Sequence, residues 1–265
     1  MDLQLIGKRA LVTGGSRGIG FAAADALAAE GADVVLVARD KAALEAAADR
    51  LAGYGHRVLT VAADTSDDEA VQAMVAQVVE EFGGVDILVN AAAQPASPNV
   101  TAGVAGTTDD ALRAEIETKV LGYLRCARAA APHMVAQGWG RIINISGLAT
   151  RQATSIVGSI RNVAVAAMTK NLADELGPAG VNVTVVHPGL TVTERTPALL
   201  ARYAETHGIS EADAERALAK GISIGRTVMA AEIGDVIAFL ASPRSVAITG
   251  DAIAVGGGAK GAIHY

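Results

Sequence analysis

The stretch Thr13-Gly14-Gly15-Ser16-Arg17-Gly18-Ile19-Gly20 decides how this chain folds. It follows a short apolar run at 9–12 and precedes helix-forming residues at 19–30, which predicts a tight turn between a strand and a helix. Gly14 permits the turn, Gly18 lets the backbone approach a pyrophosphate, and Gly20 allows the helix to pack on the strand. Because the start of a helix offers free N–H groups and partial positive charge, phosphate suits this place. We therefore expect a dinucleotide-binding turn whose cofactor contacts are Gly14, Ser16, Arg17, Gly18, Ile19 and Gly20.

Short β-branched runs alternate with alanine-rich, helix-forming stretches along the chain. Such alternation is typical of a parallel sheet covered by helices on both faces, and right-handed crossovers then make the fold doubly wound. We expect strands at 9–12, 33–37, 58–62, 86–89, 141–145, 181–186 and 252–255, and helices at 19–30, 41–52, 67–82, 108–137, 155–177 and 231–241. No linker or repeat divides the chain. The sequence therefore predicts a single-domain α/β fold over 1–265, a Rossmann-type, seven-stranded parallel sheet flanked by helices.

Composition excludes several classes of protein. The chain has 265 residues, of which 51% are hydrophobic, and a formal net charge of −6. This is too apolar for a disordered chain and not basic enough to predict a nucleic-acid partner. Apolar runs fall short of the roughly 18 residues that a membrane span needs, and residues 1–8 do not resemble a signal peptide. Cys126 is the single cysteine, so we expect a packing residue in a reducing, cytoplasmic setting.

The residues after the second expected strand decide between the two nicotinamide dinucleotides. In dinucleotide folds an acid at this place pairs with the ribose 2′-hydroxyl, whereas a basic residue binds a 2′-phosphate. Ala38 cannot accept a side-chain hydrogen bond, Arg39 follows it, and Arg17 lies in the glycine turn. Two guanidinium groups can bind a phosphate through paired hydrogen bonds, so we expect NADP(H) to be preferred over NAD(H). Asp40 is the competing feature, because its carboxylate could serve a ribose hydroxyl instead.

These and further motifs resemble those of one family, the classical short-chain dehydrogenases/reductases, over nearly the whole chain. The turn at 13–20 resembles the family's TGxxxGxG motif, residues 90–93 stand where the family has NNAG, and residues 188–193 resemble its PGxxxT motif. The resemblance implies strand order 3-2-1-4-5-6-7 and a homodimer or homotetramer built on the long helices before and after the fifth strand. It implies that Thr193 holds the nicotinamide carboxamide, and that the cofactor is also contacted by Asp64, Thr65, Asn90, Ala91, Ala92, Pro188 and Gly189.

The resemblance breaks at the catalytic positions. The family reduces its substrates with a tyrosine, a lysine four residues later, a serine, and an asparagine on the preceding helix. Counting back from residues 169–176 places Gly158 at the tyrosine position and Asn162 at the lysine position. Lys119 stands where the family has asparagine, so the amine and the amide have exchanged helices, and Ser146 lies at the serine position. We expect a retained but altered site formed by Ser146, Lys119 and Asn162, in which a lysine with a lowered pKa acts as the acid.

Other polar residues are weaker candidates. Arg151 and Arg161 are candidates for binding an acidic substrate, His187 for a substrate contact, and Tyr203 for a replacement phenol. The family places a substrate lid at 195–221, and 94–109 also borders the substrate. No His, Cys and Asp cluster has metal-ligand spacing.

Two functions follow from these residues. The first is an NADP(H)-dependent oxidoreductase that transfers a hydride to or from a small carbonyl or alcohol. The alternative is a nucleotide-binding protein that kept the fold and lost the tyrosine-dependent chemistry. The two differ in whether Lys119 points into the pocket.

Overall fold

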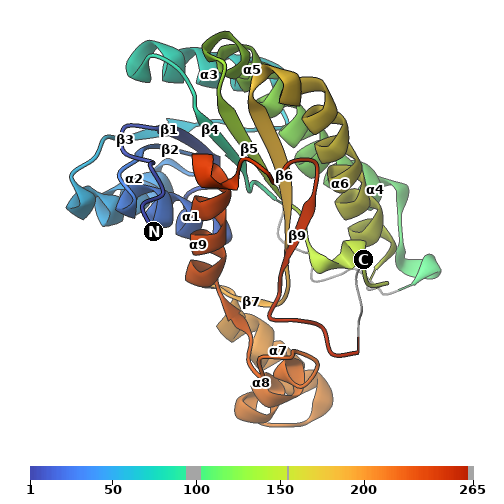
Figure 1. The fold of residues 1–265 in the computed structure, drawn as a ribbon. Helices are drawn as coiled ribbons and strands as arrows, with labels where there is room; N and C mark the ends of the chain where they lie inside the picture. Colours follow the sequence, from blue (N-terminus) through green and yellow to red (C-terminus); the bar gives the residue numbers. More distant parts are fainter. Residues whose placement is uncertain (94–102, 154, 262–265) are drawn as a thin grey trace.

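Seven parallel strands form the centre of the computed structural model, which describes residues 1–93, 103–153 and 155–261. Their order in the sheet is β3-β2-β1-β4-β5-β6-β9 (Figure 1). The strands are β1 (Arg9–Thr13), β2 (Asp33–Ala38), β3 (Val58–Ala62), β4 (Ile87–Asn90), β5 (Gly140–Ile145), β6 (Val181–Pro188) and β9 (Ala252–Val255). The expected doubly wound sheet and its strand order are confirmed. Most of the segment 94–109, which we expect to border the substrate, lies outside the described residues.

Helices cover both faces of the sheet, because successive side chains of each strand point to opposite sides. Val12 packs in the cluster formed with α1 (Gly18–Ala29), α2 (Lys41–Leu51) and α9 (Ala230–Ala241). Its neighbour Leu11 packs in the cluster on the other face, with α3 (Asp68–Phe82), α5 (Gly122–Gln137) and α6 (Ile156–Leu176). Cys126 is fully buried in this second cluster. Burial raises the pKa of its thiol to about 12, so it is a packing residue.

The expected helix at 108–137 is not continuous. It divides into α4 (Asp109–Glu115), a π-helical turn (Ile116–Leu121) and α5. π-turns are rare and occur frequently at functional sites. This one carries Lys119, the residue that the family resemblance places in the active site.

The segment 195–221, where the family resemblance places a substrate lid, contains a helix pair. The pair consists of α7 (Thr196–His207) and α8 (Glu211–Ala219), separated at Gly208, whose φ is 63°. A left-handed glycine ends a helix without strain, which explains the break. Two short strands, β7 (Thr191–Val192) and β8 (Val228–Met229), pair in parallel at the base of the insertion. Figure 1 shows α7 and α8 as a projection beyond the sheet, reached through β7.

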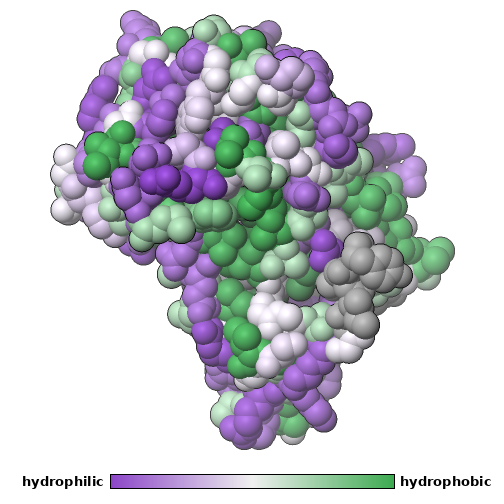
Figure 2. All heavy atoms as spheres, in the orientation of Figure 1, coloured by the Kyte–Doolittle hydropathy of each residue, from purple (hydrophilic) through white to green (hydrophobic). Residues whose placement is uncertain are grey.

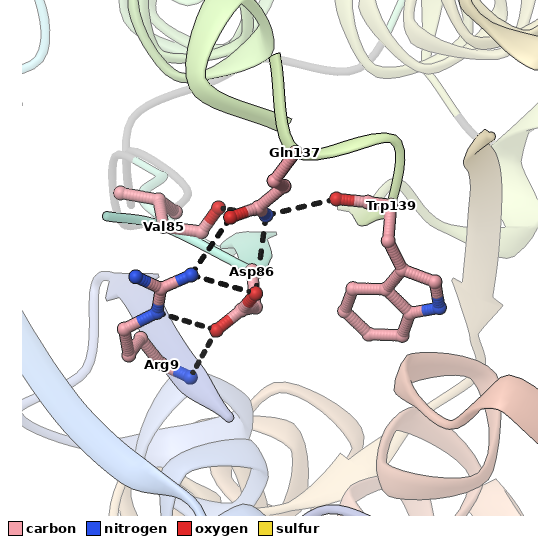
Figure 3. Close-up of polar contacts among 5 residues, drawn as sticks. All are labelled: Arg9, Val85, Asp86, Gln137 and Trp139. Carbon is pink, nitrogen blue, oxygen red and sulfur yellow. Dashed lines mark hydrogen bonds and ion pairs between the residues drawn. The ribbon is translucent and has the colours of Figure 1, made fainter. Parts of the chain in front are cut away.

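The amino ends of three strands are joined by a polar network (Figure 3). Asp86, directly before β4, accepts two hydrogen bonds from the guanidinium of Arg9, at 2.6 and 2.9 Å. Gln137, at the end of α5, donates to Asp86 and to the carbonyl oxygens of Val85 and Trp139. The Arg9 hydrogen bonds hold the pKa of Asp86 below its usual value despite burial. This network lies at the end of the sheet opposite the glycine turn, so it stabilises the fold rather than the site.

Exposed apolar side chains gather on parts of the surface. On the face shown in Figure 2, hydrophobic residues gather between the body of the sheet and the α7–α8 projection. On α6, Ile156, Ile160 and Val163 are 40%, 44% and 50% exposed. Their spacing of four and three residues places them along one stripe of the helix. Within the described ranges, no helix is both long enough and apolar enough to cross a membrane.

Candidate active site

The glycine turn lies at the carboxyl end of β1, where doubly wound sheets bind ligands. Gly14 has a φ of 68°, and a Cβ placed there would lie 2.8 Å from the carbonyl oxygen of Ala91. A Cβ on Gly20 would lie only 2.2 Å from the carbonyl oxygen of Gly14. Side chains at either position would therefore disrupt the close packing of the turn against its neighbours. The lack of space for a Cβ explains why Gly14 and Gly20 are glycines.

A carboxylate already contacts the start of α1. Both oxygens of Glu194 accept from the backbone N–H of Gly18, at 3.1 and 3.3 Å. Anions are stabilised at helix N-termini by free N–H groups and by the helix dipole. Sequence reasoning missed this residue, because a contact across 176 positions leaves no local signal. The geometry shows that this turn accepts an anion.

The ends of β2 and β3 place Arg39 beside Asp64. The Arg39 guanidinium lies 3.7 Å from the Asp64 carboxylate, and its side chain is 65% exposed. Asp64 also accepts from the backbone and hydroxyl of Ser66, and the first of these bonds is the main cause that lowers its pKa. Asp40 caps α2 by accepting from the backbone N–H of Ala43 at 3.1 Å. One oxygen of the competing Asp40 carboxylate is thus used by the helix, and both Arg39 and Asp40 line the cavity described next.

One cavity of about 690 Å³ joins the glycine turn to the expected catalytic residues. A cavity of this size suits a small-molecule ligand or cofactor. The site residues predicted from the sequence that line it are Gly14, Ser16, Arg17, Gly18, Ile19, Gly20, Arg39, Asp64, Thr65, Ala91, Ala92, Lys119, Ser146, Asn162, Pro188, Gly189 and Thr193. Arg161 and Arg195 also line it.

Asn90 is the exception among the predicted residues, because its side chain is fully buried below the cavity. Its amide donates to Asn144 Oδ1 at 2.9 Å. Asn144 in turn donates to Thr169 Oγ1, also at 2.9 Å. This chain of hydrogen bonds links β4, β5 and α6 within the core. The Asn90 side chain therefore holds the end of β4 in the core and does not line the cavity.

Lys119 is buried at the cavity wall, with 4% of its surface exposed. Its Nζ donates to the carbonyl oxygen of Ser146 at 3.0 Å and to Asn162 Oδ1 at 3.1 Å. Both acceptors are neutral, so they do not offset the loss of water around a cation. Burial, aided by the positive charge of Arg161, lowers the pKa of Lys119 to about 7, while Glu115 opposes the shift. The amine is therefore able to give and take a proton near neutral pH.

Ser146 and Asn162 hold each other as well as Lys119. The Ser146 hydroxyl donates to the backbone carbonyl of Asn162 at 3.1 Å. At the next residue, Gly147, an added Cβ would lie 3.1 Å from Asn162 Nδ2, so the Asn162 amide fills the space beside it. Gly158 carries no phenol, and its N–H donates to the hydroxyl of Ser155, which caps α6. The structure thus brings together the amine, the amide and the serine, and places Gly158 in the first turn of α6.

An ion pair lies beside this group. Arg161, the residue before Asn162, pairs with Glu115 at the end of α4. The two side chains are 20% and 17% exposed. Among the described residues, Nε of Arg161 has no hydrogen-bond partner. Sequence reasoning named Arg161 as a ligand for an acidic substrate but did not find Glu115, which instead takes up part of its charge.

Of the four other polar candidate side chains, Tyr123 lines the cavity. The hydroxyl of Tyr123 is fully buried and donates to the carbonyl oxygen of Ile145 at 3.0 Å, and burial strongly raises its pKa. Tyr203 stacks on His207 in α7, with ring centroids 4.0 Å apart. Arg151 donates to the carbonyl oxygen of Ala252. Within the described part of the chain, His187 Nδ1 has no partner, and burial lowers the pKa of this histidine to about 4. None of Tyr203, Arg151 and His187 is among the described residues that line the cavity.

The comparisons with known proteins agree with this geometry. Residues 8–204 match the sequence model of the short chain dehydrogenases. The chain belongs to the short-chain dehydrogenase family. The short-chain reductase protein NovJ of Streptomyces niveus is 36% identical over 250 residues, covering 94% of this chain and 92% of NovJ. Membership of this family and similarity to a reductase both support the conclusion that the chain is an oxidoreductase.

Two solved structures of the family are similar over nearly their whole length. L-sorbose reductase from Gluconobacter frateurii, in complex with NADPH and L-sorbose, has a TM-score of 0.92 at 32% identity and covers 99% of this chain and 100% of its own. NAD+-bound xylitol dehydrogenase has a TM-score of 0.87 at 25% identity and covers 96% of this chain and 100% of its own. The similar structures therefore include one bound to NADPH and one bound to NAD+.

Proposed function

We propose that this short-chain dehydrogenase is an NADP(H)-dependent oxidoreductase in which Lys119 replaces the absent tyrosine as the proton-exchanging group. One observation carries the proposal. The Lys119 amine lies 3.1 Å from Asn162 Oδ1 at the wall of the same cavity that the glycine turn borders. An amine retained at this place, in contact with the amide that stands at the family's lysine position, supports an altered site rather than a lost one.

The cofactor proposal rests on the fit of the cavity. The glycine turn has no room for side chains at Gly14 and Gly20, and its Gly18 N–H donates to a carboxylate, which suits the binding of a pyrophosphate. Arg17 and Arg39 are both lining residues, and they are the groups that would bind a 2′-phosphate. Asp40 also lines the cavity, but one of its carboxylate oxygens is used in capping α2. The NADPH bound to L-sorbose reductase supports the same preference.

The remaining cofactor contacts are proposals from the family resemblance. They are Ser16, Ile19, Asp64, Thr65, Ala91, Ala92, Pro188, Gly189 and Thr193, all at the cavity wall. A fluorescence titration of the purified protein with NADPH, and with NADH as control, tests the preference. Tight binding of NADPH with much weaker binding of NADH supports it. Equal binding of both contradicts it.

In the proposed mechanism, a bound nicotinamide dinucleotide supplies or accepts the hydride. The Lys119 ammonium donates its proton to the carbonyl oxygen of the substrate, which becomes an alcohol; in oxidation the neutral amine accepts that proton. Asn162 and the Ser146 carbonyl orient two of the three Nζ hydrogens, which leaves the third for the substrate. Burial keeps the proton exchangeable, because a water-exposed lysine would hold it at neutral pH.

Two substitutions test the role of Lys119. Lys119→Met removes the proton, and Lys119→Arg keeps a cation that does not deprotonate. L-sorbose and a 3-oxoacyl thioester, suggested by the named activities of related proteins, serve as probe substrates, with NADPH oxidation as readout. We expect turnover to fall at least about a hundredfold in both variants. Unchanged turnover in Lys119→Met would overturn the mechanism, and NADPH binding without turnover of any carbonyl probe would favour a non-catalytic nucleotide-binding protein.

The proposed role of Lys119 predicts that the rates of reduction and oxidation depend on pH in opposite directions. Reduction needs the protonated amine, so its rate should fall as pH rises through the pKa of Lys119, about 7. Oxidation needs the neutral amine, so its rate should fall as pH drops through the same value. The same pH limb in both directions would contradict the role of Lys119.

The quaternary structure and the lid are also proposals. The exposed stripe of Ile156, Ile160 and Val163 on α6 suits burial against a second copy, in a homodimer or homotetramer. Light scattering on the purified protein tests this, because a monomer at working concentration would contradict it. The segment 195–221 begins at the cavity residue Arg195, directly after Thr193 and Glu194, which supports our proposal that α7 and α8 form a substrate lid of a single domain over 1–265.

A further inference from the structure

The Arg161–Glu115 ion pair joins the two helices that supply the Lys119 site. Glu115 is the last residue of α4, directly before the π-turn that carries Lys119. Arg161 lies on α6, directly before Asn162, which accepts from Lys119. The pair is four-fifths buried, so solvent screens it little. The pair and the Lys119–Asn162 hydrogen bond thus connect adjacent positions of the same two segments, Glu115 and Lys119 on one side and Arg161 and Asn162 on the other.

The charges around Lys119 come from several elements. Glu115 acts from α4 and Arg161 from α6, with opposite signs. His187 on β6 also interacts with Lys119 and is kept neutral by burial, and the buried Tyr123 phenol on α5 stays protonated. Glu117, on the π-turn itself, pairs with Arg125 of α5 at 2.6 Å. Among the described residues, the charges that act on the Lys119 amine are therefore those of Arg161 and Glu115, which pair with each other.

We infer that Arg161 and Glu115 are positioning residues, which fix the π-turn against α6 and balance the charge around the Lys119 amine so that it exchanges its proton. The inference rests on the proposed function. It assigns a role to a buried pair that the hydride-transfer chemistry itself does not require. Neither residue needs to touch the substrate, because both act through Lys119.

The two members of the pair should have opposite effects when neutralised. Arg161→Met leaves the Lys119 amine beside an unpaired carboxylate, which favours the ammonium form. Glu115→Gln leaves it beside an unpaired guanidinium, which favours the neutral amine. A pair that served only to hold the helices together would respond alike to both substitutions. Opposite shifts are therefore the signature of charge balance.

The experiment measures the titration of Lys119 directly. The full-length protein is labelled with 13C-lysine, and the Lys119 signal is assigned by its loss in Lys119→Met. We expect the midpoint of its pH titration to move up by about one pH unit in Arg161→Met and down by a similar amount in Glu115→Gln. The double variant should return it close to the wild-type value. Glu117→Gln is the matched control, because this carboxylate lies on the same turn but pairs with Arg125.

If a variant that removes a charge does not fold, variants that keep the charge still test the inference. Arg161→Lys keeps the positive charge and should keep the wild-type midpoint. Glu115→Asp keeps the negative charge and should do the same. Shifts of both neutralised variants in one direction, or no shift in folded variants, would overturn the inference.

The proposed function is tested separately in the same proteins. Where Lys119 controls turnover, the pH–rate profile of NADPH oxidation moves in parallel with the titration. Opposite titration shifts without any matching change in the rate profile would support the charge balance and overturn the catalytic role of Lys119. If instead the Lys119 titration does not shift in the variants, and the rate profile keeps the wild-type midpoint near that of Lys119, the result would overturn the charge balance and support the catalytic role of Lys119.

Discussion

Replacing Lys119 by methionine should change how the stability of the fold depends on pH. The lysine has 4% of its surface exposed, and burial lowers its pKa from 10.5 to about 7. Between these values the unfolded chain binds a proton that the folded protein does not, so wild-type stability rises with pH. Each pKa unit corresponds to about 1.4 kcal/mol, so the cost of the buried cation is roughly 5 kcal/mol below the folded pKa and disappears above the unfolded value.

The assay compares the free energies of unfolding of the wild type and Lys119→Met in urea at about pH 6.5 and about pH 9.5. The difference between the two proteins should shift in favour of the wild type by about 3 kcal/mol across this range. The variant also leaves the Ser146 carbonyl and Asn162 Oδ1 without their donor, but that loss does not depend on pH and cancels. Lys220→Met, at an exposed position, is the control and should show no such shift. A shift below about 1 kcal/mol would refute the buried-amine argument.

Three further predictions concern the rest of the molecule. Arg39→Ser should weaken NADPH binding about tenfold or more and leave NADH binding unchanged in a fluorescence titration; equal losses for both would contradict a contact with the 2′-phosphate. Asp86→Ala should lower the free energy of unfolding by about 3–5 kcal/mol in urea denaturation, because it leaves the Arg9 guanidinium without its carboxylate; a loss under about 1 kcal/mol would show that this network contributes little. Glu194→Ala should tighten NADPH binding about two- to fivefold, because it removes the anion from the Gly18 N–H; weaker binding would mean that the carboxylate assists the cofactor.

The sheet could be predicted because its signals are local and repeated. The strands are short apolar runs, and α2, α3 and α6 begin at capping residues, as at Asp67, which caps α3 through two backbone N–H groups. The strands β7 and β8 were not predicted, because two residues each are too few to show a period. The π-turn was missed for a related reason: its one extra residue alters the helical spacing over a single turn only.

The site was predictable where it depends on register and not where it depends on long-range contacts. Counting along α6 placed Asn162 at the family's lysine position, and the structure shows its Oδ1 in contact with Lys119. The catalytic roles of Lys119, Asn162 and Ser146 stay predictions. The contacts of Glu115 with Arg161 and of Glu194 with Gly18 join residues 46 and 176 positions apart. Only the folded chain brings such residues together, so no local pattern marks them.

The π-turn at Ile116–Leu121 holds one residue more than regular α-helix would need to join α4 to α5. Deleting one residue within the turn would let the segment relax to regular α-helix while α4 and α5, which is packed in the core, keep the faces they present. The residues that change place are those of the turn itself, Lys119 among them. The gene can therefore lose one codon here and alter the site without altering the fold around it.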